Sequence, residues 1–150
     1  MRERFQTFTV LITNINRCIK KIKTEEMEQF NLKSPHVSCL YYLFKLEPLT
    51  AKELCDVCKE DKASLSRSIE YLEENKLIKC NSPLLKRYKS PLYLTDNGKK
   101  VAEKIALKID NILNEASFGL TEEKRTALYE SLNLINDNLE KLCKKYEGEK

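Results

Sequence analysis

Two short helical patterns follow one another directly in the middle of the chain, and each begins with its own capping residue. The first opens at Thr50 and carries Glu53 three positions later, which is the spacing of a capping box. It lasts only about two and a half turns before a second helix begins behind Asp61. Helices this short are marginal alone and must pack against each other. The segment therefore predicts a helix-turn-helix.

The second of these helices has an apolar side and a small polar side. Leu65, Ile69 and Leu72 fall on one side at the helical repeat of about 100° per residue. The opposite side begins with Ala63 and Arg67, flanked by serines. Short side chains around one guanidinium suit a helix that enters a narrow space and forms hydrogen bonds there. The alternative is an ordinary solvated helix face.

A basic extended segment follows the second helix. The stretches "KLIKC" and "PLYLT" predict two strands of a hairpin, joined by the loop "NSPLLKRYKS". Residues 75–95 contain five basic residues and no acidic one, in a chain that has 23 acidic residues. A basic hairpin beside a helix-turn-helix is typical of proteins that bind a nucleic-acid duplex. Phosphate neutralisation would supply affinity, and the helix would read the sequence.

Long amphipathic helices flank this middle segment. Residues 2–23 carry a narrow apolar seam at alternating spacings of three and four, formed by Phe5, Phe8, Ile12, Ile15, Ile19 and Ile22. After a helix that we expect to be capped by Ser34, with a stripe formed by Val37, Leu40, Tyr41 and Phe44, and after the middle segment, the helical pattern resumes at Thr95. A last helix, capped by Thr121, carries Leu128, Leu132, Ile135, Leu139 and Leu142. The middle segment is too small to cover these stripes, so we expect a dimer.

Composition narrows the class of protein further. The chain has 150 residues, of which 41% are apolar and 33% charged, with only three Gly and four Pro. This length supports one domain with a core, and the few Gly and Pro favour helices. No apolar run approaches the roughly 20 residues that cross a bilayer, and no leader segment is recognisable. We therefore expect a cytoplasmic protein without a membrane partner.

The candidate reactive residues do not assemble into an enzyme or a metal site. The sequence lacks a Gly-rich phosphate loop, a paired-carboxylate motif and a nucleophile elbow. Cys55 and Cys58 have the spacing of a metal or redox motif, but the chain has one His and no second such pair. We interpret both as buried packing residues among six reduced cysteines. We expect no enzymatic activity and no cofactor.

In their order along the chain, these motifs resemble the MarR-type winged-helix transcriptional regulators. Such proteins carry an E-L-A-type helix, a D-K-S-T-V-T-R recognition helix, L-E-x-x-G-L-I, a wing and L-T-x-x-G. The matching stretches here are "LTAKELCDVC", "DKASLSRSIEYLEENKLIKC" and "LYLTDNGKK". The resemblance covers nearly the whole chain in element order and is sharpest over residues 49–98.

The resemblance implies a mainly α fold with a small β-hairpin wing, in which residues 1–150 form a single MarR-like domain. A winged helix-turn-helix core over about 34–98 would be flanked by dimerisation helices over about 2–23 and 96–145. The implied function is sequence-specific binding of double-stranded DNA at a near-palindromic operator by a homodimer. The family default is a repressor that responds to a small amphipathic effector.

The resemblance also assigns residues by position. The DNA-binding residues would be Lys62, Ala63, Ser64, Ser66 and Arg67 in the recognition helix, and Lys86, Arg87 and Lys89 in the wing. The dimerisation residues would be Phe8, Ile12, Ile15, Ile19, Leu128, Leu132, Ile135 and Leu139.

The sequence departs from the family pattern at three places. The wing's usual Asp-x-Arg pair is absent, because Lys86 and Tyr88 stand at those positions beside Arg87. Asn75 stands where a turn glycine is common, which Asn tolerates because it adopts left-handed backbone geometry. Glu60 occupies a position that is often apolar.

Two alternatives stay open within the winged-helix interpretation. One is a protein-interaction module that has lost DNA binding, against which the basic wing argues. The other is a thiol-based regulator that senses oxidation through Cys18, whose cationic neighbours would lower its pKa. Because Cys18 lies one step from the seam between Ile15 and Ile19, we expect it instead to be a packed thiol.

Overall fold

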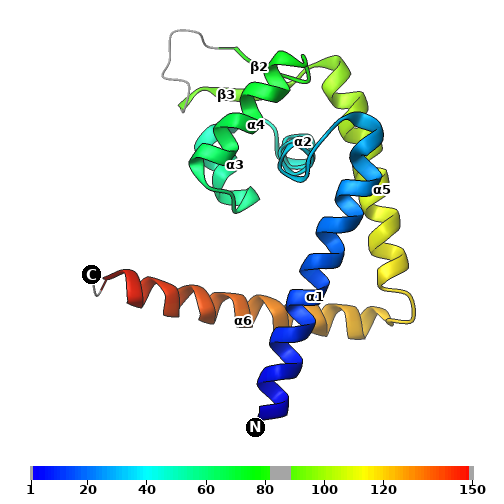
Figure 1. The fold of residues 1–150 in the computed structure, drawn as a ribbon, viewed down its shortest axis with the longest axis vertical. Coiled ribbons are helices and arrows are strands. Elements are labelled where there is room, and N and C mark those ends of the chain that lie inside the picture. Colours follow the sequence, from blue (N-terminus) through cyan, green and yellow to red (C-terminus); the bar gives the residue numbers. More distant parts are fainter. Residues whose placement is uncertain (1, 82–88, 149–150) are drawn as a thin grey trace. The chain divides into compact units, whose positions relative to one another are not determined.

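A computed structural model gives the fold and describes residues 2–81 and 89–148, with side chains from residue 7 onward (Figure 1). The helices are α1 (Arg2–Met27), η1 (Glu28–Phe30), α2 (Ser34–Leu46), α3 (Ala51–Cys58), α4 (Lys62–Glu74), α5 (Asp96–Ala116) and α6 (Glu122–Gly148). The strands are β1 (Leu49–Thr50), β2 (Ile78–Cys80) and β3 (Pro91–Leu94). The predicted class is confirmed: the fold is mainly α-helical with a small β-sheet.

The chain divides into two compact units, Met1–Ile109 and Asp110–Lys150. The first unit contains α1, the helix-turn-helix, the sheet and most of α5. The second contains the last turns of α5 and all of α6. Each unit is described by itself.

The sheet has one strand that the sequence did not reveal. Its order is β1-β3-β2, and both neighbouring pairs are antiparallel. In the register, Leu49 and Cys80 lie on either side of Leu92. β1 is only two residues long and leads directly into α3, so it has no room for the alternating pattern by which strands are recognised.

The core forms where α2, α3, α4 and α5 meet the inner side of the sheet. Its fully buried members come from distant parts of the chain and include Leu40, Leu43, Leu54, Leu65, Leu72, Leu92 and Ile105. The predicted stripe of α4 is confirmed, since Leu65, Ile69 and Leu72 are all buried.

The predicted stripe of α2 is partly wrong. Val37 and Leu40 are buried as expected, whereas Phe44 is exposed and Tyr41 is half-buried. Cys39 and Leu43 are buried in their place. The physical reason is that α2 packs against α1, α3, α4 and β3 at once, so its buried arc is wider than one stripe and is turned toward the helix-turn-helix.

The predicted capping residues are correct for three of the four helices. The Thr50 hydroxyl accepts from the Glu53 amide at 3.2 Å, while the Glu53 carboxylate accepts from the Thr50 amide at 2.8 Å. Asp61 accepts from the Ser64 amide at 2.9 Å, and Thr121 accepts from the Lys124 amide at 3.3 Å. Each bond satisfies an amide that has no partner within its own helix.

Ser34 is not the cap of α2, contrary to expectation. The N-cap position is Lys33, which has no side-chain acceptor. His36 supplies the missing interaction, because its Nδ1 accepts from the Lys33 amide at 3.0 Å. The imidazole therefore takes the place of the Glu or Gln that usually closes this first turn.

The turn after α4 also differs from expectation. Asn75 has φ −83° and is not left-handed. Its backbone and side-chain amides both donate to the Tyr71 carbonyl, which holds it against the end of the helix. The left-handed residue is Lys76, with φ 56°.

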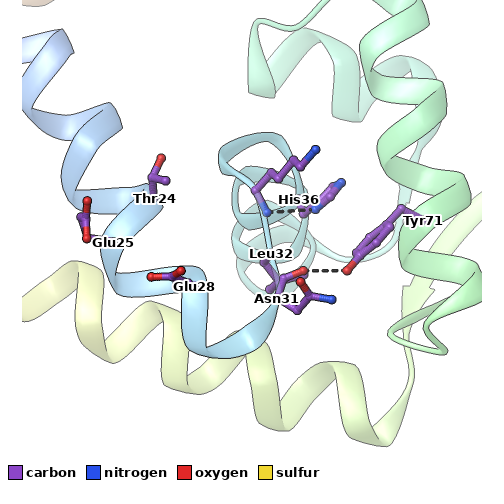
Figure 2. Close-up of a pocket in the computed structure, with 8 residues that line it drawn as sticks. Thr24, Glu25, Glu28, Asn31, Leu32, His36 and Tyr71 are labelled. Atoms are coloured by element: carbon purple, nitrogen blue, oxygen red, sulfur yellow. Dashed lines mark hydrogen bonds between the residues drawn. The ribbon is translucent and has the colours of Figure 1, made fainter.

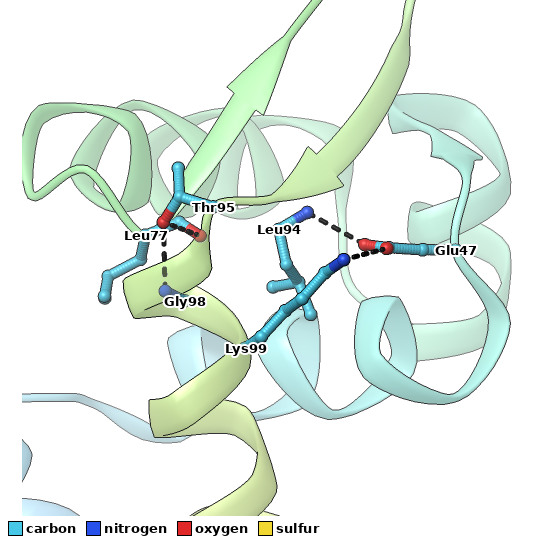
Figure 3. Close-up of polar contacts among 6 residues, drawn as sticks. All are labelled: Glu47, Leu77, Leu94, Thr95, Gly98 and Lys99. Atoms are coloured by element: carbon cyan, nitrogen blue, oxygen red, sulfur yellow. Dashed lines mark hydrogen bonds and ion pairs between the residues drawn. The ribbon is translucent and has the colours of Figure 1, made fainter.

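A close joint connects the hairpin to α5 (Figure 3). The Thr95 amide donates to the Leu77 carbonyl at 3.0 Å, and the Thr95 hydroxyl accepts from the Gly98 amide at 2.9 Å. A Cβ atom on Gly98 would lie 1.8 Å from the Leu77 carbonyl oxygen. The glycine of the "LTDNG" motif is thus required by contact with backbone, which cannot move aside as a side chain could.

Glu47 fastens the same joint from the other side (Figure 3). Its carboxylate accepts from the Leu94 amide at 2.9 Å and lies 3.5 Å from the Lys99 ammonium. The end of α2 is thereby tied to both β3 and the first turn of α5.

We predict that Gly98→Ala destabilises the protein by at least about 2 kcal/mol, because overpacking against fixed backbone forces the joint apart. Helix propensity alone would favour Ala by about 1 kcal/mol, so the sign of the change is decisive. Urea denaturation measures it. Gly148→Ala is the matched control, since nothing lies within 4 Å of that position. Equal stability of Gly98→Ala and wild type would contradict the proposed close contact.

Candidate nucleic-acid interface

The first two turns of α4 bring the predicted recognition residues onto one outward face. Lys62, Ala63, Ser66 and Arg67 are exposed, and Ser64 is half-buried. The opposite side of the helix is anchored in the core by Leu65, Ile69 and Leu72. Among the described residues, Arg67 has no hydrogen-bond or ion-pair partner, so its guanidinium is free to bind a ligand.

The turn that precedes α4 is held by local contacts. Lys59 closes α3 in left-handed geometry, with φ 54°. The Cys55 thiol then donates to the Glu60 carbonyl at 2.9 Å. Asp61 follows as the cap of α4. This turn sets the direction in which the outward face of α4 points.

Two aromatic side chains hold the other end of α4 (Figure 2). The Tyr71 hydroxyl donates to the Asn31 carbonyl at 2.6 Å, and the Tyr71 ring stacks on the His36 ring with centroids 4.2 Å apart. Burial, and secondarily the charge of Lys33, lowers the pKa of His36 below its ordinary value. The imidazole is therefore neutral at neutral pH and can accept the capping bond described above.

A cavity of about 350 Å³ opens beside this stack (Figure 2). The end of α1, the α1–α2 connection, the start of α2 and the end of α4 contribute its walls. The lining residues are Thr24, Glu25, Glu28, Asn31, Leu32, Lys33, His36 and Tyr71. A ligand in this cavity would touch the aromatic stack that holds α4.

The wing is described only in part. Lys76 and Lys79 are exposed at the start of the hairpin, and Lys89 is exposed where the chain returns toward β3. Lys86 and Arg87 lie outside the described residues. The described cations thus surround the base of the hairpin, in a window that contains no acidic residue.

The predicted dimerisation residues lie on long stripes that this chain leaves largely uncovered. On α1, Phe8, Ile12, Ile15 and Ile19 are between 37% and 51% exposed. On α6, Leu128, Ile135 and Leu139 are exposed and Leu132 is half-buried. No described side chain of α6 is buried.

The cysteines take three kinds of environment. Cys18 and Cys143 are exposed, Cys39 is buried, and Cys55, Cys58 and Cys80 are half-buried. The expectation that Cys18 is packed and that Cys55 and Cys58 are buried is therefore not met within this chain. In the part of the chain that the structure describes, no three His, Cys, Asp or Glu side chains gather at a point that could hold a metal ion.

Sequence reasoning missed how Asn31, His36 and Tyr71 work together. Tyr71 stood out only as a neighbour of the outward face of α4, and the Tyr71–Asn31 bond joins residues 40 positions apart. A histidine three residues inside a helix that lacks a capping side chain is the one local signal that could have pointed to this cluster.

Comparison with known proteins places the sequence among transcriptional regulators. No protein-family model matches the sequence. The chain is 32% identical over 120 residues to the uncharacterized HTH-type transcriptional regulator YwoH of Bacillus subtilis, covering 78% of this chain and 87% of that protein. None of the described helices is long and apolar enough to cross a membrane.

Solved structures show the same fold. Staphylococcus aureus MarR in complex with salicylate and kanamycin superposes with a TM-score of 0.82 at 21% identity, covering 93% of this chain and 94% of that one. The S. aureus MepR–DNA complex gives 0.78 at 21% identity, with 89% and 97% covered. NMB1585, a MarR family regulator from Neisseria meningitidis, gives 0.76 at 22% identity, with 93% and 97% covered. The chain belongs to the MarR family of winged helix-turn-helix, DNA-binding transcriptional regulators.

Proposed function

We propose that the protein is a homodimeric repressor that reads a near-palindromic operator in the cytoplasm and leaves it when a small amphipathic effector binds. The outward face of α4 is the single observation that carries this proposal. It combines exposed small side chains, a guanidinium without a partner among the described residues, and a helix rigidly anchored in the core.

The chemistry of that face suits the major groove. An Arg side chain can donate to O6 and N7 of one guanine at the same time. Ala63 and Ser66 are short, so the backbone of α4 can approach the base edges. Lys62 and Ser64, on the first turn, are positioned for phosphate or base contacts at the helix N-terminus, where the helix dipole also attracts phosphate.

The wing would contribute affinity rather than sequence reading. Lys89 is exposed, and the sequence places Lys86 and Arg87 in the same hairpin. The family's acidic partner for the wing arginine is absent here, so nothing orients Arg87 toward a particular base. We therefore assign Lys86, Arg87 and Lys89 to phosphate contacts, which carry no sequence information.

The exposed stripes support a homodimer. Single exposed apolar residues are ordinary, but the stripes of α1 and α6 each extend over several helical turns and call for a covering surface. Two copies joined by Phe8, Ile12, Ile15 and Ile19, and by Leu128, Leu132, Ile135 and Leu139, would cover both. A two-fold dimer presents two α4 helices to successive major grooves, which matches a near-palindromic operator.

The cavity beside the His36–Tyr71 stack is our candidate effector site. The solved MarR of S. aureus was captured with salicylate and kanamycin, and here too a small molecule would find ring surface next to charged groups. A ligand that displaces Tyr71 from Asn31 would loosen the end of α4 and weaken operator binding. A panel of aromatic acids and amines, added to the DNA titrations below, should contain compounds that release the protein.

Operator fragments are first selected from the protein's own genome, and binding is then titrated at several salt concentrations. We predict that Arg67→Ala lowers the preference for operator over scrambled DNA by about 1–3 kcal/mol in each half-site, because a bidentate guanine contact disappears. Lys89→Ala, the matched control from the wing, should weaken both DNAs alike. It should also reduce the salt slope by about 0.9 for each phosphate that the protein no longer neutralises. Full specificity in Arg67→Ala would mean that α4 is not the reader.

For the dimer, we predict that Ile15→Lys and Leu132→Lys weaken self-association at least about 100-fold or unfold the protein, since a charge would enter an apolar interface. Thr13→Lys is the control, because it adds the same charge on the other side of α1. Analytical ultracentrifugation at micromolar concentration distinguishes the species. A stable wild-type monomer, or an Ile15→Lys protein that still sediments as a dimer, would refute the proposed interface.

A further inference from the structure

Two cysteines from different helices meet inside the helix-turn-helix. Cys39 lies in the middle of α2 and is completely buried. Cys58 is the last residue of α3 and is half-buried, so one side of it remains open to solvent. The two thiol groups form a hydrogen bond across the interface between α2 and α3.

The two thiols differ in chemical character. The hydrogen bond from Cys39 lowers the pKa of Cys58, and the positive charge of Lys23 lowers it further against the opposing effects of burial and Glu60. The same bond and deep burial raise the pKa of Cys39. Cys58 is thus the thiol that ionises and can attack, while Cys39 stays protonated behind it.

No other cysteine has this arrangement in the described part of the chain. Cys55 donates to the Glu60 carbonyl instead, and Cys18 and Cys143 are exposed on separate helices. Cys55 and Cys58 are close in sequence, but residues three apart on a helix have Cβ atoms about 5–6 Å apart, whereas a disulfide needs about 3.5–4.5 Å. A bond between Cys55 and Cys58 would therefore require α3 to unwind.

We propose that Cys39 and Cys58 form an oxidisable pair that a hydroperoxide converts into a disulfide joining α2 to α3. The Cys58 thiolate attacks the outer peroxide oxygen, so the O–O bond breaks, an alcohol or water leaves, and Cys58 becomes a sulfenic acid. The Cys39 sulfur then displaces hydroxide from that sulfenic acid, and its proton leaves with the hydroxide as water. In total, two thiols lose two electrons and two protons, and the peroxide is reduced to an alcohol and water.

The disulfide would act on the recognition helix through the end of α3. Bonded sulfur atoms are about 2 Å apart, much closer than hydrogen-bonded ones, so Cys58 must move toward α2. Cys58 is followed at once by left-handed Lys59, by Glu60 and by the cap of α4 at Asp61. A shift at Cys58 therefore displaces the first turn of α4, whose role in reading DNA is the proposed function on which this consequence rests.

The first experiment maps the thiols in the full-length protein. After treatment with hydrogen peroxide or cumene hydroperoxide, the remaining thiols are alkylated and the peptides are identified by mass spectrometry. We expect a Cys39–Cys58 disulfide in wild type and, in equal yield, in the control Cys55→Ser. Cys58→Ser should form none, and Cys39→Ser should leave a sulfenic acid on Cys58 that dimedone traps. A dominant Cys55–Cys58 or intermolecular disulfide, or free Cys39 and Cys58 when Cys18 and Cys143 are already oxidised, would overturn the proposal.

The second experiment measures the consequence. Oxidised wild-type protein should bind its selected operator about tenfold more weakly, which is within the usual range of coupling between sites. Dithiothreitol should restore the affinity, and Cys58→Ser should be insensitive to peroxide. A disulfide that forms without changing operator binding would refute the switch. Failure of the reduced protein to bind any operator would refute the proposed function alone, because the peptide map uses no DNA.

Discussion

The approach of Gly98 to the Leu77 carbonyl fixes the way in which the winged helix continues into α5. The Leu77 carbonyl also accepts the Thr95 amide, so the start of the hairpin and the start of α5 share one backbone group. Leu77 in turn donates its amide to Leu72 at the end of α4. The recognition helix, the hairpin and α5 are therefore joined through a few backbone hydrogen bonds, and any side chain larger than hydrogen at Gly98 would separate them.

The recognition helix is held at three points that differ in kind. Its middle is anchored by apolar packing, its start depends on the short turn after α3, and its end is clamped by Tyr71 against Asn31 and His36. The cavity lies at the clamp and the cysteine pair at the turn. A ligand and an oxidant would thus act on opposite ends of the same helix, while the core that carries the helix stays unchanged.

Local features of the fold could be predicted from the sequence. The caps at Thr50 and Asp61, the buried side of α4 and its exposed polar side all depend on residues within one or two turns of each other. Contacts between distant segments could not be predicted in this way. The Glu47 carboxylate meets the Leu94 amide across 47 positions, and no local pattern announces that partner.

Two errors have the same physical origin. The left-handed turn residue is Lys76 rather than Asn75, because Asn75 is drawn back onto the Tyr71 carbonyl. The pairing of Cys39 with Cys58 was hidden by the more conspicuous spacing of Cys55 and Cys58, since proximity in sequence gives no information about which thiols meet across two helices. In both cases tertiary packing decided between options that the sequence left equal.

Chemical interference on a selected operator tests most directly whether the outward face of α4 reads bases in the major groove. Dimethyl sulfate places a methyl group on guanine N7 in the major groove and on adenine N3 in the minor groove. We predict that methylation of particular guanines, placed symmetrically in the two half-sites, excludes DNA from the complex, and that Arg67→Ala loses this sensitivity. Binding that tolerates guanine N7 methylation throughout the operator, and is blocked only by methylation of adenine N3, would contradict the account.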